Sequence, residues 1–445
     1  MKQVNMYKVL ATTVILGQTL VGPVLSHADT VLTNAVSHSQ QQNTYDNTLK
    51  NFRFTNFAED VEKDFKDKPK EAKDWIEKKL EEQGKKMSSS DTKALQDFMK
   101  KDNKEINNYL YKNKGELVDK DPLNSKIEKL DKILEHEQTD TSMKVYRIFP
   151  NMKKEDAEKL KGTILPRSDY VLTSLTNITG SSPIVELTVP KGSHAAFGIE
   201  SGFKGLITER GTGYSVTDVK EVTDKGVVRT KIEAKLLSNK EMKERESKLN
   251  DVSKSLSDTM KLPVSLQLSG AETIASIEKA RKVITEASTA LEGISKIVPT
   301  FNASELLKKL NAEGLHFNLK DSPTLGEKYA GFYNSKTKEL ELDIKREVID
   351  TNTPLHELGH AIDHIFFGLN IEKDPSLKQI VSAELQAFLR LCDWEQKPEH
   401  KAYYNAPDEY WAEAFARFMT NNENLKKEAP QTYQYIIDKL KELSL

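Results

Sequence analysis

Cysteine is nearly absent from this chain, with Cys392 alone among 445 residues. A single cysteine excludes an intramolecular disulfide, so stability must come from packed cores. Charge of one sign is not in excess either, because 66 Lys and Arg residues face 68 Asp and Glu residues and leave a formal net charge of −2. Since no basic stretch is interleaved with aromatic residues, we expect no nucleic-acid partner.

Long apolar runs are missing as well. Beyond the N-terminus no segment offers about 18 consecutive apolar residues, so we expect no stable membrane insertion. The apolar run Val9–Leu25 is short, is interrupted by Gln18 and Pro23, and precedes Ser26-His27-Ala28, a pattern typical of signal peptidase cleavage. We therefore interpret residues 1–28 as a signal peptide, in preference to a retained membrane anchor, and expect a secreted, extracellular protein.

What is present is a charge-rich, foldable composition, with 37% apolar and 30% charged residues over a length that implies two or three domains. Residues 29–51 are rich in Ser, Gln, Asn and Thr and predict a flexible leader. Apolar residues then recur at helical spacing in three segments, 57–83, 91–111 and 122–136. Short β-branched and aromatic runs follow and predict strands at 144–149, 170–175, 184–189, 205–208, 213–216 and 227–234. Helices followed by strands predict an α+β domain over residues 52–235.

Three features of this domain resemble the ADP-ribosyltransferase exotoxin family. They are Arg147 in the first strand, Thr173-Ser174 in the second, and Arg210-Gly211-Thr212 after a later one. The resemblance implies that fold, with Arg147 as the residue that orients NAD.

The same resemblance also predicts a degenerate site. Counting back from Arg210 places the family's Glu-x-Glu pair on Phe203-Lys204-Gly205, and Leu172 stands where the family has the first Ser of its Ser-Thr-Ser strand. Without the carboxylate, the electrostatic stabilisation of the state in which nicotinamide leaves is lost. We expect an inactive domain with a vestigial NAD site at Arg147; the alternative is a transferase that uses a displaced Glu200 or Glu209.

Residues 236–297 are predicted as a helical connector, with helices at 236–258 and 270–296 separated by Leu262-Pro263-Val264. The last domain, 298–445, is predicted as an α+β arrangement of helix, hairpin, metal-binding helix and a further helix that supplies a ligand. The chain as a whole is therefore predicted to be a multidomain α+β protein.

The metal-binding helix is predicted from a short motif. Thr353 suits the N-cap and Pro354 the first helical position. His356 and His360 then lie one turn apart on one face, where both imidazoles can reach a tetrahedral Zn²⁺, and Glu357 lies beside them to accept a proton from water. The five-residue motif also arises by chance on solvated helices, but a strand pattern before it and two carboxylates after it favour the metal.

The third ligand is predicted outside this helix. His364 continues the four-residue spacing, but two turns separate it from His356 by about 12 Å along the axis, too far for one metal. Glu409 lies 49 residues beyond His360, on a predicted helix, and is our choice for the third ligand. Glu413, one turn further, is expected to accept the other N–H of a ligand imidazole. For each carboxylate the alternative is an ordinary surface residue.

Three blocks in order resemble the anthrax lethal factor family of zinc peptidases, which includes the Pro-Pro endopeptidases. They are His356–Asp363, Glu409–Phe415 and Ala429–Ile436. The resemblance implies His356, His360 and Glu409 as ligands, Glu357 as general base, and a tyrosine as oxyanion donor. Tyr404 is nearest the expected position for that tyrosine, with Tyr403 the runner-up.

Lethal factor also carries a decayed ADP-ribosyltransferase-like domain before its peptidase domain. We expect no counterpart here of the toxin's N-terminal domain, which docks on a pore-forming partner. We expect the strand at 339–344 to align an extended substrate by β-augmentation.

Three hypotheses follow. The first is a secreted, toxin-like zinc endopeptidase that acts on peptides or proteins, host proteins included, with a pore-forming translocation partner as an open option. The second is the NAD-dependent transferase with a displaced Glu, and the third is a non-catalytic secreted binding protein.

Overall fold

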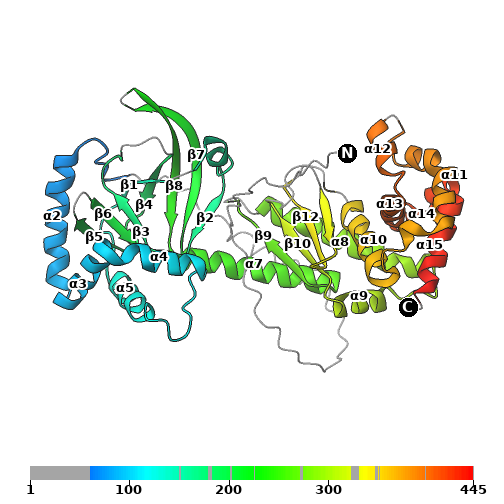
Figure 1. Cartoon of the computed structure of the whole chain (residues 1–445), viewed down its shortest axis with the longest axis horizontal. Coiled ribbons are helices and arrows are strands. Elements are labelled where there is room, and N and C mark those ends of the chain that lie inside the picture. The colour runs from blue at the N-terminus through cyan, green and yellow to red at the C-terminus, as the bar shows by residue number, and fades with distance from the viewer. Residues whose placement is uncertain are drawn as a thin grey trace, which may run out of the picture. The chain divides into compact units, whose positions relative to one another are not determined.

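The computed structural model describes residues 61–443 apart from gaps at 150–151, 179–182, 201–202, 225, 271–273, 322–329, 346–348, 350 and 396. The predicted signal peptide and leader lie outside the described residues. The chain divides between Glu244 and Arg245 into two compact units, whose elements are labelled in Figure 1. In the described part, no helix is long and apolar enough to span a membrane.

The first unit places helices before and beside an eight-stranded sheet with the order β2-β7-β8-β4-β1-β3-β6-β5. Its helices are α2 (Pro69–Lys86), α3 (Ser89–Asp97), η1 (Phe98–Asp102), α4 (Asn103–Lys112), α5 (Asn124–His136) and α6 (Lys154–Glu158). Its strands are β1 (Met143–Ile148), β2 (Ile164–Arg167), β3 (Val171–Ser174), β4 (Ile184–Val189), β5 (Ala195–Glu200), β6 (Phe203–Thr208), β7 (Thr212–Asp224) and β8 (Val227–Leu237).

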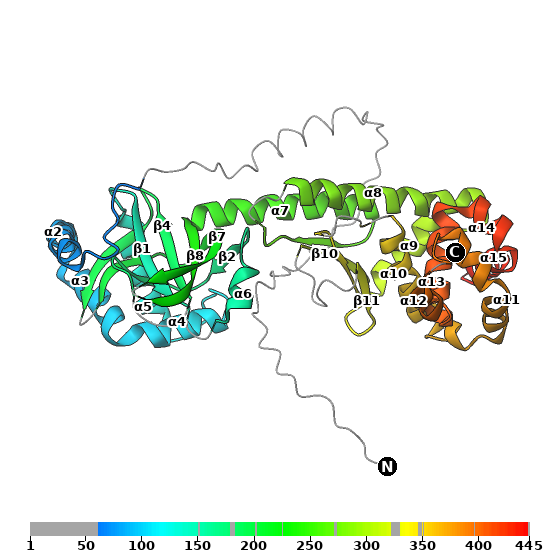
Figure 2. The ribbon, with the colours of Figure 1, turned by 90° about the horizontal axis from the view of Figure 1, so that it is seen from above.

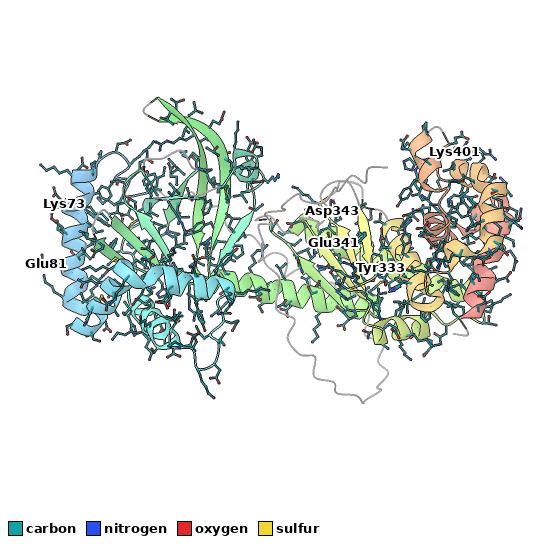
Figure 3. The ribbon with its side chains drawn as sticks, in the orientation of Figure 1. Lys73, Glu81, Tyr333, Glu341, Asp343 and Lys401 are labelled. Carbon is teal, nitrogen blue, oxygen red and sulfur yellow. The ribbon has the colours of Figure 1, made fainter. Side chains whose placement is uncertain are left out.

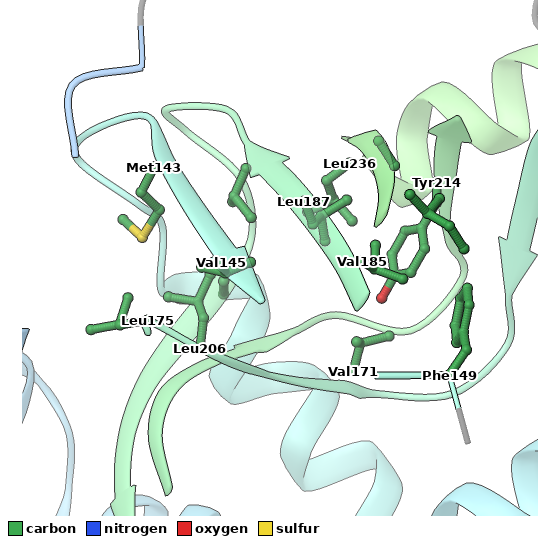
Figure 4. Packing of buried hydrophobic residues seen from close by; sticks show 14 of the residues in the cluster. Met143, Val145, Phe149, Val171, Leu175, Val185, Leu187, Leu206, Tyr214 and Leu236 are labelled. Atoms are coloured by element: carbon green, nitrogen blue, oxygen red, sulfur yellow. The ribbon is translucent and has the colours of Figure 1, made fainter. Parts of the chain in front are cut away.

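The core of this unit follows from strand alternation. Alternate residues of β1 and β4 point to one face, where Val145, Val185 and Leu187 are buried among side chains from β3 and β6 (Figure 4). The first predicted helix begins later than expected, because Pro69 occupies its first turn, where a missing N–H costs no hydrogen bond. Strands β2 and β5 were not predicted. β2 contains a proline, and β5 opens with two alanines, which have low strand propensity.

The second unit combines a four-stranded mixed sheet with helices. Helix α7 (Asn239–Met260) crosses the division between the units, and the other elements are β9 (Val264–Gln267), α8 (Ile274–Ile297), α9 (Ala303–Ala312), β10 (His316–Lys320), β11 (Gly331–Asn334), β12 (Glu339–Asp343), α10 (Asn352–Ile362), η3 (Asp363–Phe367), η4 (Ile371–Lys373), α11 (Pro375–Leu391), α12 (Pro398–Tyr403), α13 (Pro407–Thr420), α14 (Asn422–Glu428) and α15 (Pro430–Glu442). Figure 2 shows α8 running along the sheet. The multidomain α+β class predicted from the sequence is confirmed.

The sheet order is β11-β12-β10-β9, with β10 parallel to both β9 and β12 and β11 antiparallel to β12. Figure 3 labels Tyr333 on β11 and Glu341 and Asp343 on β12. Strand β9 lies in the segment predicted as a helical connector, where no strand was expected. The domain boundaries 52–235, 236–297 and 298–445 stay a prediction.

The two edges of this sheet differ. At β9, the hydroxyl oxygens of Ser253 and Ser257 on α7 accept hydrogen bonds from the amides of Leu266 and Val264, at 3.0 and 2.8 Å. That edge is therefore covered by a helix, whereas β11 forms the other edge. The expectation that the strand at 339–344 aligns a substrate is wrong, because β12 is paired on both sides and has no free edge.

Candidate metal centre

Helix α10 carries the motif found in the sequence. It begins at Asn352, one residue before the predicted cap, so Thr353 lies inside the helix and the N-cap is Thr351. Pro354 still falls in the first turn, where its missing N–H leaves no helical hydrogen bond unmade. The helix is buried along most of its length, including His356 and Glu357.

Three predicted ligand residues come together at one point. The Nε2 atoms of His356 and His360 lie 3.2 Å apart, and Oε2 of Glu409, on α13, lies 3.2 Å from the first and 3.4 Å from the second. Ligands held about 2.05 Å from a tetrahedral Zn²⁺ stand about 3.3 Å apart, which is the edge length of that tetrahedron. The observed triangle therefore has the size that zinc requires, and these residues form a candidate metal site.

The hydrogen bonds and charges of these side chains also suit a bound cation. His356 Nδ1 lies 3.1 Å from Glu413 Oε2 and donates its hydrogen to that carboxylate, which leaves Nε2 of a neutral ring with a lone pair. Glu409 Oε2 is buried and has no hydrogen-bond partner among the described residues. Burial opposes protonation of His356, but Glu409 and Glu413 outweigh it and raise its pKa to about 10. The centre thus favours bound positive charge.

Glu413 is held from two sides. One carboxylate oxygen accepts from His356, and the other accepts from Arg417 Nε at 2.8 Å. Burial raises the pKa of Glu413, but His356 and Arg417 reverse this and lower it below its usual value. Glu413 therefore stays ionised and fixes the orientation of the His356 ring, as expected for the carboxylate behind a metal-binding imidazole.

Gly359 explains how α13 reaches these histidines. A Cβ at this position would lie 2.8 Å from Ala412 Cα, closer than side chains tolerate. Trp411 Nε1 donates a 2.9 Å hydrogen bond to the Gly359 carbonyl, which locks the same crossing. The glycine inside the motif is thus required by the close approach of the two helices that carry the ligands.

The Glu357 side chain, on α10, lies against strand β11. A Cβ added to Gly331 would lie 2.9 Å from Glu357 Cγ, so the strand passes directly over this side chain. The Tyr333 amide donates to the carboxylate. Burial raises the pKa of Glu357, while His356 and His360 oppose the shift.

His364 does not join the triangle. It lies in η3, a π-helical turn that follows α10, and its Nδ1 is 2.8 Å from the Tyr333 hydroxyl. It is thus a polar neighbour of the site, bound to the strand over Glu357. Burial raises the pKa of Tyr333 to about 12, so that hydroxyl stays protonated.

The structure separates the two tyrosine candidates. Tyr404 is buried, and its ring stacks on Trp394 at 4.9 Å with an interplanar angle of 4°. Tyr403 is 43% exposed, and burial and, after it, the nearby Glu409 raise the pKa of its hydroxyl. The runner-up, rather than Tyr404, is therefore the tyrosine whose hydroxyl reaches the candidate metal centre.

In the first unit, the predicted NAD position is incomplete. Gly205, where the family pattern places its carboxylate, pairs with Ser174 in the ladder between β3 and β6. Arg147 Nη1 is buried without a hydrogen-bond partner in the described part of the chain. Of the displaced candidates, Glu200 lies 3.4 Å from Lys100, and Glu209 accepts from the Asn239 amide at 3.2 Å. Each of these carboxylates thus contacts another residue, and the inactivity of this domain as a transferase stays a prediction.

Four residues of the second unit were missed by the sequence reasoning, namely Gly331, Tyr333, Trp394 and Arg417. The spacing from Glu409 to Arg417 is two helical turns, which places Arg417 on the face of Glu413 and was a usable signal. The other three approach the centre only through tertiary folding, so no local pattern marks them.

Comparisons with known proteins agree with both resemblances. The family model for ADP-ribosyltransferase exoenzyme matches residues 72–239, and the model for anthrax toxin lethal factor, N- and C-terminal domain, matches residues 324–439. Both matches confirm the families predicted from the sequence. Among curated proteins, none matches this chain.

Similar solved structures are ADP-ribosyltransferase toxins. Plx2a from Paenibacillus larvae is 26% identical with a TM-score of 0.36, covering 39% of this chain and 99% of its own. The C3 exoenzyme of Clostridium limosum is 22% identical with a TM-score of 0.35, covering 40% and 98%. BECa of C. perfringens, solved with NADH, is 16% identical with a TM-score of 0.38, covering 55% and 64%. Residues 72–239 of the chain thus match the ADP-ribosyltransferase exoenzyme family, and residues 324–439 match the anthrax toxin lethal factor family.

Proposed function

We propose that the chain is a secreted, toxin-like zinc endopeptidase whose active site is the centre on α10 and α13. The observation that carries the proposal is the triangle of His356 Nε2, His360 Nε2 and Glu409 Oε2, with sides of 3.2 to 3.4 Å. The lethal factor match over residues 324–439 covers all three residues and supports zinc as the metal.

In this mechanism a bound zinc ion would polarise the scissile carbonyl and make a water molecule more acidic. Glu357 accepts the proton of that water and delivers it to the leaving amine. Its buried position keeps the pKa above the usual carboxylate value, which suits a group that must both take and release a proton. The Tyr403 hydroxyl, beside Glu409, donates a hydrogen bond to the oxyanion that develops on the carbonyl.

Strand β11 is the surface that can hold an extended substrate. The Asp343 amide donates to the Ala330 carbonyl at 2.9 Å, so Ala330 is hydrogen-bonded to β12. In an antiparallel ladder such pairs alternate, and the backbone groups of Gly331 and Tyr333 therefore point away from β12. A peptide paired with this edge would pass over Glu357, because Gly331 lies against that side chain.

The first unit is proposed to serve as a scaffold or recognition surface without transferase activity. The engaged positions of Glu200 and Glu209 support this reading. Toxin-type domains favour a host protein as the substrate, while uptake through a pore-forming partner stays a prediction.

The test is cleavage of a randomised peptide library by the zinc-loaded chain and by its Glu357→Gln variant. We expect cleavage by the parent only, with equal zinc content in both proteins, because the glutamine amide leaves the ligands in place but cannot accept the proton. Asp438→Asn, which alters an exposed carboxylate on α15, is the matched control and should cleave like the parent. Equal cleavage by the Glu357→Gln variant would refute the assignment of the base.

A further inference from the structure

Three residues outside the proposed chemistry connect two parts of the candidate centre. Arg417 Nε donates to Glu413 Oε1 at 2.8 Å, and the Arg417 guanidinium carbon lies 5.3 Å from the centroid of the Trp394 ring. The Trp394 ring in turn stacks on Tyr404, at 4.9 Å and nearly parallel. Tyr404 directly follows Tyr403, whose hydroxyl lies near enough to Glu409 for that carboxylate, after burial, to raise the pKa of Tyr403.

We propose that Arg417 and Trp394 are positioning residues of the peptidase, with Arg417 holding Glu413 against His356 and Trp394 holding Tyr403 against Glu409. The inference rests on the proposed function. The inference adds that one cation–aromatic contact, between Arg417 and Trp394, links Glu413, the carboxylate behind a metal ligand, to the oxyanion donor Tyr403.

The first half of the proposal, the role of Arg417, follows from the burial of its ion pair with Glu413. The side chains of Glu413 and Arg417 are 5% and 16% exposed, so their ion pair is shielded from water. Removing the guanidinium leaves a buried carboxylate that is held on one side only, by the His356 ring, so that the carboxylate can reorient. Loss of such a supporting contact typically weakens metal binding by about 10- to 100-fold.

The second half of the proposal, the role of Trp394, follows from the contacts that attach α12 to the rest of the unit. This six-residue helix has no buried residue of its own. Its contacts to the rest of the unit include His400, which stacks on Trp394 at 4.8 Å, and Tyr404, which stacks on the same indole just after the helix ends. Trp394 is therefore the platform that fixes the end of α12, and the position of Tyr403 depends on it.

A purely structural role for the two residues makes a different prediction. If they only stabilise the fold, each substitution should lower the unfolding temperature and reduce activity equally in any background. If they act through Glu413 and Tyr403, the effects divide: Arg417 acts on zinc affinity, and Trp394 acts on kcat only while the Tyr403 hydroxyl is present.

The experiment uses the full chain with four single variants, one double variant and a control. Arg417→Gln, Arg417→Lys, Trp394→Leu and Tyr403→Phe, with the double variant of the last two, are compared by zinc competition against a chelator and by kcat on one cleaved peptide. Lys426→Gln is the control, because it removes a cation–aromatic contact of 5.7 Å to Tyr433 elsewhere in the unit. Thermal unfolding establishes that each variant folds.

We expect Arg417→Gln to weaken zinc binding by about 10- to 100-fold, Arg417→Lys to recover part of this loss, and Lys426→Gln to change nothing. We expect Trp394→Leu to lower kcat at least about tenfold with unchanged zinc affinity, and to have less than about a twofold effect once Tyr403 is replaced by Phe. Unchanged zinc affinity in Arg417→Gln, or an equal loss of kcat in both tyrosine backgrounds, overturns the corresponding half. A parent chain that binds zinc but cleaves nothing overturns the proposed function and the Trp394 half, while the zinc measurement still decides the Arg417 half.

Discussion

Replacement of Gly359 by alanine tests the helix crossing on which the centre depends. The added Cβ would lie 2.8 Å from Ala412 Cα, whereas ordinary contact begins near 3.4 Å, so α10 and α13 must separate by about 0.6 Å. If that shift is passed on in full, the 3.2 Å distance from His356 Nε2 to Glu409 Oε2 grows to about 3.8 Å, well above the roughly 3.3 Å tetrahedral edge.

The expected energy follows from two opposing effects. Overpacking costs about 1–3 kcal/mol, and alanine gains about 1 kcal/mol over glycine inside a helix, so the free energy of unfolding of the metal-free unit should fall by up to about 2 kcal/mol. Zinc affinity should fall at least about tenfold, because the ligands no longer match the metal.

Gly293→Ala is the matched control, since it lies in α8 of the same unit with nothing within 4 Å of the added Cβ. It should gain up to about 1 kcal/mol and keep its zinc affinity. Thermal unfolding of both metal-free variants and zinc competition against a chelator measure these effects. If the Gly359→Ala variant binds zinc as tightly as the control, the helix crossing does not set the ligand geometry.

Three further outcomes are expected. In the metal-free protein, the raised pKa of His356, about 10 against 6.5, stabilises the fold fully below pH 6.5, and this contribution is lost as pH rises toward 10. Because zinc must displace that proton, its apparent affinity should rise about tenfold per pH unit between about 6.5 and 9, measured by competition corrected for the chelator; a flat profile would exclude the shift. Tyr333→Phe keeps the amide that binds Glu357 and should change kcat less than about threefold, whereas a loss above about tenfold would place the Tyr333 hydroxyl in the chemistry. The chain should release no nicotinamide from NAD, because Gly205 supplies no carboxylate beside Ser174; turnover abolished by Glu209→Gln would contradict this.

Local patterns predicted those parts of the structure that neighbouring residues determine. Strand alternation located β1 and β4 to within a residue. The spacing of His356 and His360, with Glu409 and Glu413 on a later helix, predicted residues that the fold brings within hydrogen-bonding distance. Helical periodicity accounts only for the shared face within each pair, since the members of each pair lie four residues apart, whereas the resemblance to the lethal factor family implied that the two helices meet at one metal.

Long-range features could not be predicted in the same way. Strand β9 has the sequence Val-Ser-Leu-Gln between two long helices, and it becomes a strand because β10 pairs with it. The choice between Tyr403 and Tyr404 depends on which ring Trp394 covers, a contact that spacing does not encode. Likewise, the free edge falls on β11 because β10 pairs with β12 from the other side, so the strand nearest the motif in sequence is not the one exposed.

The central claim is that one zinc ion is bound by two imidazoles and one carboxylate between α10 and α13. The most direct measurement is an anomalous difference map at the zinc edge from crystals of the zinc-loaded chain. We expect a single peak per chain, about 2.0–2.2 Å from His356 Nε2, His360 Nε2 and Glu409 Oε2. A zinc-loaded protein with no peak at these three atoms, or with its peak at other residues, would contradict the account.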